Sequence, residues 1–499
     1  MQEYIILRRN NEAILFGTIP ELDYADFLDI NAAALDSPGR HCASLFGMRE
    51  GSELRLICCV ADDSDGAIRI NSAKVDPTKE YPSLSARRLA YYMFEREIWE
   101  SFGLRYSDHP WLKPVRYSHD RFDLSQTISN YPFYSIHSEE LHEVGVGPIH
   151  AGVIEPGHFR FICKGEQIQH MEIQLGYQHR GVEKLFLEKN FLGRALLAES
   201  IAGDAAAGHA TAHAELMEAL SGVEASKALR SSRALAIELE RIAVHTGDLS
   251  AICGDVAYQL GASVFGRLRT PVINFTQRWC GNRLGKGLIR PGYVNYTFTK
   301  ELNSLLNETF DKFEPDFEEM IDEFFHNPGC LSRLEKTGVV TANQAEEIGA
   351  VGMAAKASGL SRDIRSSHPD DAYKELMHRP TVKRHGDVYS RTQIRREEVI
   401  QSIGYARKLG EAVSNSPAEA PLKLESKPDL FAVSLVEGWR GEICHCAVTG
   451  DRGELIRYKV KDPSFHNWLA LALAVRKNEI SDFPICNKSF NLSYCGFDL

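Results

Sequence analysis

The stretch GRALLAESIAGDAAAGHATAHAELMEAL, residues 193–220, decides the fold of the larger part of the chain. Its apolar residues recur with helical spacing, and many of them are alanine, the strongest helix former. The stretch ASKALRSSRALAIELERIAVHTGDLSAICGDVAYQL, residues 225–260, has the same character and follows a glycine at 222. We expect a close-packed antiparallel pair of long helices, because small side chains allow two helices to approach closely.

Further helices are expected in the same part of the chain. The helical period returns in residues 303–325, 395–413 and 465–478, whereas residues 430–450 and 454–462 alternate as a pair of strands. Helices therefore dominate this part.

The beginning of the chain has a different pattern. Residues 40–75 alternate apolar and polar side chains around the turn signal DDSDG, which is typical of strands joined by a hairpin. Residues 82–104 have a helical period, with Ser83 or Ser85 as the candidate N-cap. The sequence predicts a multidomain protein, with these parts: a small α+β domain over residues 1–122, a polar linker over 123–145 and a larger, mainly α-helical domain over 146–499.

Composition excludes several classes of function. Of the 499 residues, 57 are Lys or Arg and 68 are Asp or Glu, and the resulting net charge of -11 argues against nucleic acid as a partner. No apolar run approaches the roughly 20 residues that span a bilayer, and the N-terminus lacks the features of a signal peptide. We expect a cytoplasmic chain that docks on a membrane complex through partner proteins.

The 11 cysteines include no CxxC pair, and no glycine-rich dinucleotide motif follows a strand. Reduced thiols in the core are the expected state. Cofactors are therefore not expected in this chain, and iron–sulfur clusters are expected in partner subunits.

Several motifs carry a resemblance to a known family. FEREIWESFGLRYSDHPWLKP, residues 94–114, resembles the small hydrophilic 30 kDa subunit of respiratory complex I. GPIHAGVIEPGHFRFICKGEQIQHMEIQLGYQHRGVEKLF, residues 147–186, resembles the 49 kDa quinone-site subunit and, more closely, the large subunit of group 4 nickel–iron hydrogenases of the formate hydrogenlyase and energy-converting type. The likeness continues through ELERIAVHTGDL, GNRLGKGLIRPGYV, VEGWRGE and NKSFNLSYCGFDL. The resemblance implies the fold of that family and a fusion of the two complex I-like parts.

Such hydrogenases hold nickel and iron with four cysteine thiolates. The resemblance places these thiolates at Ala202, Ala205, Ser493 and Gly496 of this sequence, which we call the four ligand positions. Cys495 falls between the last two. Because soft thiolates bind these ions and alanine has no donor atom, no metal site is expected in this chain.

Three further residues have candidate roles through the resemblance. Glu183 matches an acid that relays protons beside the metal, and burial would raise its pKa toward neutrality; the competing interpretation is a helix salt bridge to Arg180 or Lys184. Arg440 matches an arginine over the metal pocket, and Asp204 either pairs with it in proton or charge coupling or faces solvent.

His150 corresponds to a loop that reaches the quinone in complex I. It is a candidate quinone-binding residue or, alternatively, a residue that only caps its loop.

Two weaker patterns involve histidine and cysteine. His209 and His213 lie four residues apart, on one helix face, and could bind zinc, although the spacing alone is a weak signal. Cys444 and Cys446 point to one face of a strand, where core thiols are the expected state.

The leading interpretation is a hydrogenase-like subunit without a nickel–iron centre. It would serve as core scaffold and coupling subunit of a membrane-associated, complex I-like redox complex. The resemblance implies as partners an iron–sulfur small subunit, a ferredoxin-like iron–sulfur subunit and antiporter-like membrane subunits, at the cytoplasmic face of the inner membrane. The alternative is a redox subunit that reduces a quinone or another small acceptor at the old pocket. Hydrogenase activity of the chain itself conflicts with the four ligand positions.

Overall fold

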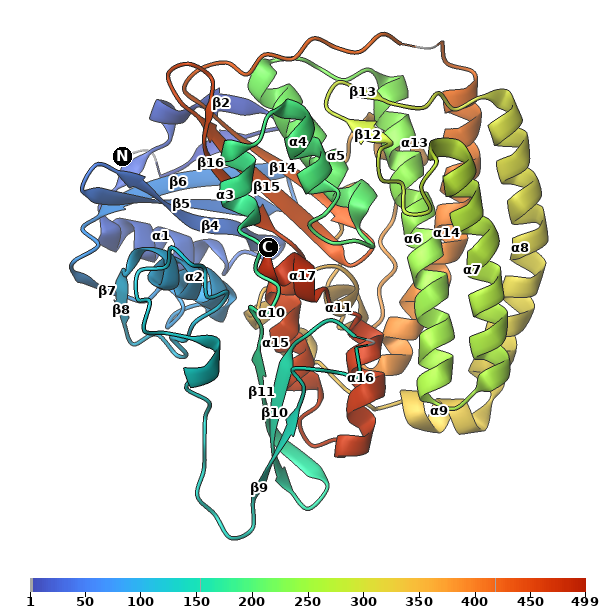
Figure 1. The fold of residues 1–499 in the computed structure, drawn as a ribbon, viewed down its shortest axis with the longest axis horizontal. Coiled ribbons are helices and arrows are strands. Elements are labelled where there is room, and N and C mark those ends of the chain that lie inside the picture. The colour runs from blue at the N-terminus through green and yellow to red at the C-terminus, as the bar shows by residue number, and fades with distance from the viewer. Residues whose placement is uncertain (1–2, 153, 418) are drawn as a thin grey trace.

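The computed structural model describes residues 3–152, 154–417 and 419–499. A five-stranded sheet, in the order β1-β6-β5-β4 with β3 parallel to β6, forms the N-terminal part (Figure 1). The bounds are β1 Ile5–Leu7, β3 Glu21–Leu22, β4 Arg40–Glu50, β5 Glu53–Asp62 and β6 Ala67–Val75, with helices α1 Tyr24–Ala34 and α2 Tyr92–Phe102. The predicted α+β pattern is therefore present.

The start of α2 differs from the prediction. Ser83 and Ser85 do not cap a helix, because both hydroxyls donate hydrogen bonds to the buried carboxylate of Glu95. The helix begins only at Tyr92, after a short 3₁₀ turn. The polar segment before it is held by tertiary contacts, which sequence periodicity does not report.

A second sheet belongs mainly to the end of the chain. It has the order β16-β15-β14-β2, so the predicted pair of strands is three strands joined by a segment from the N-terminus. The bounds are β2 Ala13–Leu15, β14 Leu430–Gly438, β15 Gly441–Thr449 and β16 Leu455–Lys461. Side chains of both sheets, such as Phe46 and Phe431, share one apolar core. The two sequence-distant parts are therefore packed together.

Four long helices stand side by side on the other side of the molecule (Figure 1). They are α6 Lys227–Asp255, α7 Gln259–Cys280, α8 Lys300–His326 and α14 Val388–Ser414. The stretch 193–220 forms two helices, α4 Phe191–Ala198 and α5 Ala206–Ser221, separated by residues 199–205. The predicted close pair of α5 with α6 is wrong in its packing, because α5 lies mainly on β14 and β15 while α6 packs between α7 and α14.

The remaining elements connect these layers. A three-stranded sheet projects from the body, and three helices close the chain (Figure 1). The sheet consists of β9 His142–Val146, β10 His158–Lys164 and β11 Gln167–Gln174, and α3 Val182–Glu188 follows it. The closing helices are α15 Ser464–Ala474, α16 Phe483–Phe490 and α17 Tyr494–Asp498. Short helices lie between α8 and α14, namely α9 Pro328–Leu334, α10 Ala342–Glu347, α11 Gly352–Ala357, α12 Ile364–Ser367 and α13 Asp371–Leu376. Short strands are β7 Glu80–Pro82, β8 Arg105–Ser107, β12 Ile289–Arg290 and β13 Tyr293–Val294.

Within the described residues, none of the helices has the length and apolar character needed to cross a membrane. The described cysteines are all free thiols, and ten of them are buried. This agrees with the prediction of reduced core thiols.

Candidate functional site

Two loops bring the four ligand positions together. One loop joins α4 to α5, and the other leads from α16 into α17. The guanidinium of Arg180 joins them, because it donates hydrogen bonds to the carbonyl oxygens of Ser200 at 2.6 Å, Ile201 at 3.0 Å and Cys495 at 2.9 Å. Segments nearly 300 residues apart in the sequence thus form one site.

The side chains at these positions do not fit a thiolate-bound centre. Ala202 and Ala205 lie in an apolar cluster with Trp439 and four other buried side chains. The hydroxyl of Ser493 accepts a hydrogen bond from the backbone of Gly496 at 2.9 Å and so caps α17. Alanine and glycine supply no donor atom, so these positions offer no thiolate.

The space beside Gly496 is already filled. A β-carbon added there would lie 2.7 Å from Oδ2 of Asp462 and 2.8 Å from Oγ of Ser493, closer than such contacts occur. The remaining thiol, Cys495, has a pKa raised to about 11 by burial and by Glu155. Within the residues that the structure describes, no group of three or more His, Cys, Asp or Glu side chains is arranged to hold a metal ion.

Asp204 and Arg440 form an ion pair, which was one of the two arrangements that the sequence left open. The guanidinium donates two hydrogen bonds to the carboxylate, at 2.6 and 2.7 Å, and a third to the carbonyl of Asn491 at 2.6 Å. It stacks on the indole of Trp439, 4.0 Å from the ring centroid. Burial opposes the charge of Arg440, but Asp204 outweighs burial and raises the Arg440 pKa. Arg440, in the turn between β14 and β15, thus links Asp204 in the first loop to Asn491 in the second.

Glu183 is held differently from the prediction. Its carboxylate pairs with Arg457 at 3.2 Å and with Lys459 at 3.0 Å, and it accepts a hydrogen bond from the backbone of Val460 at 3.0 Å. Burial alone would raise its pKa, but the charges of Lys459 and Arg457 lower the pKa to about 2. The expectation of a near-neutral pKa is therefore wrong.

The alternative partners of Glu183 are also wrong. Arg180 faces backbone carbonyls, and Lys184 pairs with Asp120 at 3.3 Å. Glu183 lines a cleft of about 460 Å³ between the N-terminal part and the larger part, together with Glu97 and Arg116.

His150 lies at the base of a loop and closes it. Its Nε2 lies 2.8 Å from the carbonyl oxygen of Gly157, and its ring lies against Phe159. Of the residues in this loop, Val153 is outside those that the structure describes. This geometry is the loop-capping arrangement.

His209 and His213 are fully buried and take part in a chain of hydrogen bonds that the sequence did not reveal. Nδ1 of His213 and Nδ1 of His445 each lie 2.9 Å from the hydroxyl of Tyr458. Nε2 of His445 lies 3.1 Å from Nδ1 of His209, whose Nε2 lies 3.1 Å from Oδ2 of Asp462. We call these five residues the imidazole chain.

Strand alternation was the sequence signal that could have identified one member of the imidazole chain, His445. If Cys444 and Cys446 share one face of β15, His445 must point to the other face. The two thiols lie 3.7 Å apart in the core between the sheets, and His445 faces α5. Zinc binding by His209 and His213 is not supported, because both nitrogens of His209 already have partners.

A second buried polar group lies beside β14. Lys356 contacts Glu398 at 2.5 Å and Asp363 at 3.2 Å, and Arg365 contacts Asp363 at 2.7 Å and Glu238 at 3.3 Å. All five side chains are buried. We call them the ionic cluster.

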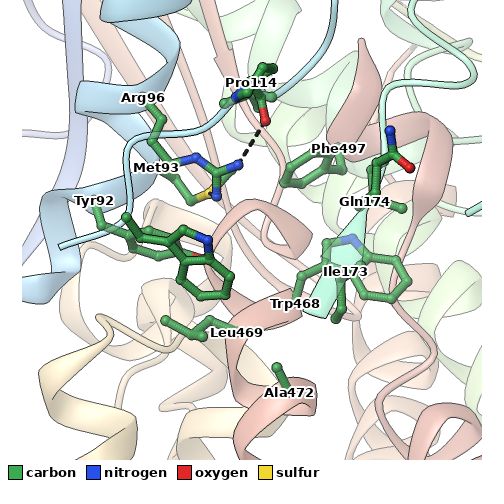
Figure 2. Close-up of a pocket in the computed structure, with 13 residues that line it drawn as sticks. Tyr92, Met93, Arg96, Pro114, Ile173, Gln174, Trp468, Leu469, Ala472 and Phe497 are labelled. Atoms are coloured by element: carbon green, nitrogen blue, oxygen red, sulfur yellow. Dashed lines mark hydrogen bonds between the residues drawn. The ribbon is translucent and has the colours of Figure 1, made fainter. Parts of the chain in front are cut away.

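An apolar pocket lies between α2, β11, α15 and α17 (Figure 2). Trp468 and Phe497 line it, and Arg96 at its rim donates a hydrogen bond to the carbonyl of Pro114 at 2.7 Å. Its volume is about 40 Å³, whereas small-molecule sites occupy about 300–1,000 Å³. The pocket is a packing gap between the two parts rather than a quinone site.

Comparison with known proteins agrees with this architecture. Residues 21–127 match the family of the respiratory-chain NADH dehydrogenase 30 kDa subunit, and residues 255–429 match that of the 49 kDa subunit. Hydrogenase-4 component G from Escherichia coli is 27% identical over 84% of this chain and 75% of its own length.

Two further relatives match similar fractions of this chain and of their own length. Formate hydrogenlyase subunit 5 of Escherichia coli is 27% identical over 84% of this chain and 77% of its own. The C/D component of NADH-quinone oxidoreductase from Phocaeicola vulgatus is 26% identical over 77% of this chain and 79% of its own. The chain therefore joins a region of the complex I 30 kDa type to a region of the 49 kDa type, and it is similar along most of its length to components of hydrogenases and of NADH-quinone oxidoreductase.

Proposed function

We propose that this chain is a core scaffold and coupling subunit of a membrane-associated, complex I-like redox complex, and that it holds no nickel–iron centre. The carrying observation is the state of the four ligand positions. Two are alanines in an apolar cluster, one is a helix-capping serine, and the last is a glycine with no room for a side chain. A charged pair, Asp204 with Arg440, stands beside them.

The partners follow from the relatives. Their names are those of single components of larger assemblies, including a membrane-bound hydrogenase subunit alpha from Pyrococcus furiosus. The proposed partners are an iron–sulfur small subunit, a ferredoxin-like iron–sulfur subunit and antiporter-like membrane subunits. The chain would then lie peripherally on the cytoplasmic face of the membrane, held by those subunits.

In this proposal the chain contributes charge coupling rather than metal chemistry. A change of charge in a neighbouring iron–sulfur subunit would act on the Asp204–Arg440 pair through the buried guanidinium of Arg440, because charges interact more strongly where water is excluded. Glu183, ionised and held by two cations, would keep the cleft between the two parts at fixed charge. No contact among the described residues favours reduction of a quinone at the ligand positions over this role.

The test is elemental analysis of the full chain, purified with its complex and with each subunit identified by mass spectrometry. We expect no stoichiometric nickel, with iron and sulfide accompanying a smaller subunit. Nickel at about one atom per chain would overturn the proposal. Purification of the chain alone, without iron–sulfur partners, from cells that express the whole gene set would overturn the assignment to a complex.

A further inference from the structure

The imidazole chain connects the interior of α5 to the four ligand positions without a gap. Each neighbouring pair of its five side chains lies within 3.1 Å, and all five are fully buried. His213 and His209 come from α5, His445 from β15, and Tyr458 and Asp462 from β16 or just after it. Asp462 is the last member of the imidazole chain and lies beside Gly496.

The protonation of each group follows from its surroundings. Burial lowers the pKa of His213 to about 3 and that of His445 well below its usual value, so both rings are neutral at pH 7. Burial would raise the pKa of Asp462, but His209 and Arg440 lower it, so its carboxylate is ionised. A neutral imidazole has one N–H donor and one bare nitrogen that accepts.

When His209 is neutral too, every hydrogen bond has one direction. The ionised Asp462 can only accept, so Nε2 of His209 carries the proton and Nδ1 of that neutral ring is bare. His445 must then donate from Nε2 and accept at Nδ1, where the Tyr458 hydroxyl supplies the proton. The phenol oxygen in turn accepts from Nδ1–H of His213. All four donors point toward Asp462.

The first member of the chain has a free acceptor. Nε2 of His213 is bare in this arrangement, and among the described residues this buried atom has no hydrogen-bond partner. An unpaired polar atom in the interior is costly, so such atoms are rare and call for an explanation. Here the bare nitrogen stands where a chain of donors begins.

We propose that the imidazole chain conducts protons from His213 to Asp462. A proton that reaches Nε2 of His213 binds there, and the Nδ1 proton of that ring moves to the oxygen of Tyr458. The phenol proton moves to Nδ1 of His445, the Nε2 proton of His445 moves to Nδ1 of His209, and the Nε2 proton of His209 moves to Asp462. One proton enters at His213 and one proton reaches Asp462. Afterwards each hydrogen bond joins the same two atoms but runs in the opposite direction.

This proposal rests on the proposed function and deepens it, because the imidazole chain would deliver a proton next to the Asp204–Arg440 pair. Arg440 acts electrostatically on Asp462, so protonation of that carboxylate would change the balance of charge at the pair. At the other end, the charges of Arg194 and Arg290 face His213. They disfavour a resting charge on that ring and so favour passage of the proton onward.

Neutron diffraction from crystals of the full-length protein, grown in heavy water, tests the imidazole chain directly. We expect one deuteron between each of the four neighbouring pairs, with deuterons on Nδ1 of His213 and on Nε2 of His445 and His209. A pair with no deuteron between its atoms would overturn the proposal. This measurement does not depend on the redox complex.

A kinetic measurement on the purified complex tests conduction. Dithionite reduces the iron–sulfur clusters, and a pH indicator dye follows proton uptake. Tyr458→Phe removes the hydroxyl that joins His213 to His445, so we expect proton uptake to slow by about tenfold or more while cluster reduction keeps its rate. An unchanged rate of uptake would overturn the proposal.

Tyr373→Phe is the matched control for this variant. Tyr373 is also a buried tyrosine, and its hydroxyl donates a hydrogen bond to Glu238 at 2.7 Å, but it lies outside the imidazole chain. Its removal should leave uptake unchanged. Loss of uptake in Tyr458→Phe alone supports conduction, whereas equal losses in both variants would overturn it. Absence of iron–sulfur clusters from the wild-type preparation would instead count against the proposed function.

Discussion

The ionic cluster and the imidazole chain are two buried polar groups with opposite properties. In the ionic cluster, full charges face one another: Lys356 and Arg365 against Glu398, Asp363 and Glu238. In the imidazole chain, the same burial surrounds mostly neutral rings and one phenol.

The difference decides what each group can do. In the ionic cluster, burial opposes both charges, but ion pairing outweighs it: the pKa of Glu398 is held well below its usual value and the pKa of Lys356 above its own. Neither side chain exchanges protons near neutral pH, so the cluster fixes geometry. The imidazole chain lets each proton move between two acceptors without moving a heavy atom.

Removing a cation from the ionic cluster should have the largest effect on stability. Lys356→Met keeps most of the side chain's length but leaves Glu398 without its nearest cation and Asp363 without one of its two cations. Since breaking a buried ion pair costs about 3–5 kcal/mol, we expect a loss of that size in the free energy of unfolding by urea. Lys312→Met, at an exposed pair with Glu308, should change stability by less than about 1 kcal/mol. Similar effects of both variants would contradict the structural role of the cluster.

The pH dependence of stability should distinguish a third kind of buried group. Glu215 on α5 has a pKa raised from 4.5 to about 8, chiefly by burial. The folded state therefore binds more protons than the unfolded state between these values, so stability falls as pH rises through this window, by about 1.4 kcal/mol per pH unit at most.

Glu215→Gln should make the measured slope shallower by the contribution of Glu215, because glutamine keeps the hydrogen bonds and does not titrate. Unfolding in urea at pH 5, 6, 7 and 8 measures the slope for the variant and for the wild type side by side. Parallel pH profiles for the two chains would show that Glu215 titrates normally.

Filling the space beside Asp462 tests how firmly the end of the imidazole chain is fixed. Gly496→Ala adds a β-carbon 2.7 Å from the carboxylate. Overpacking of this kind costs about 1–3 kcal/mol, which thermal or urea unfolding would reveal. Gly203→Ala is the control, because a β-carbon at that position meets no described atom within 4 Å. If Gly496→Ala is as stable as Gly203→Ala, the carboxylate of Asp462 moves freely.

The smallest effect is expected at the exposed end of the site. Asp204→Asn removes one charge from the pair with Arg440, and because Asp204 is partly exposed to solvent we expect a loss of about 1 kcal/mol. Asp451→Asn, whose carboxylate is almost fully exposed beside Arg452, should change stability by less. The loss at Asp204 should shrink as salt concentration rises; a loss independent of salt would show that charge is not its cause.

Much of the fold could be predicted from the sequence because its signals are local. Alternation in residues 40–75 predicted strands joined by a hairpin where β4, β5 and β6 lie, and the period of residues 303–325 predicted a helix where α8 lies. The break at residues 199–205 was missed, since the small residues there fit a helix as well as a loop. The place of β2 in the C-terminal sheet was not predictable, because strand partners far apart in sequence leave no local trace.

The candidate site likewise has features that the sequence determined and features that only the tertiary structure decided. The sequence alone determined that the four ligand positions lack cysteine, since that depends only on residue identity. It left open whether Asp204 pairs with Arg440 or faces solvent, and the structure decided for the pair. Only the tertiary structure decided the charge of Glu183, because its pKa depends on Arg457 and Lys459, cations from another element. It also decided the imidazole chain, whose members come from one helix and two strands. Hydrogen bonds between distant elements form only when packing brings donor and acceptor within about 3 Å, and no sequence period encodes that distance.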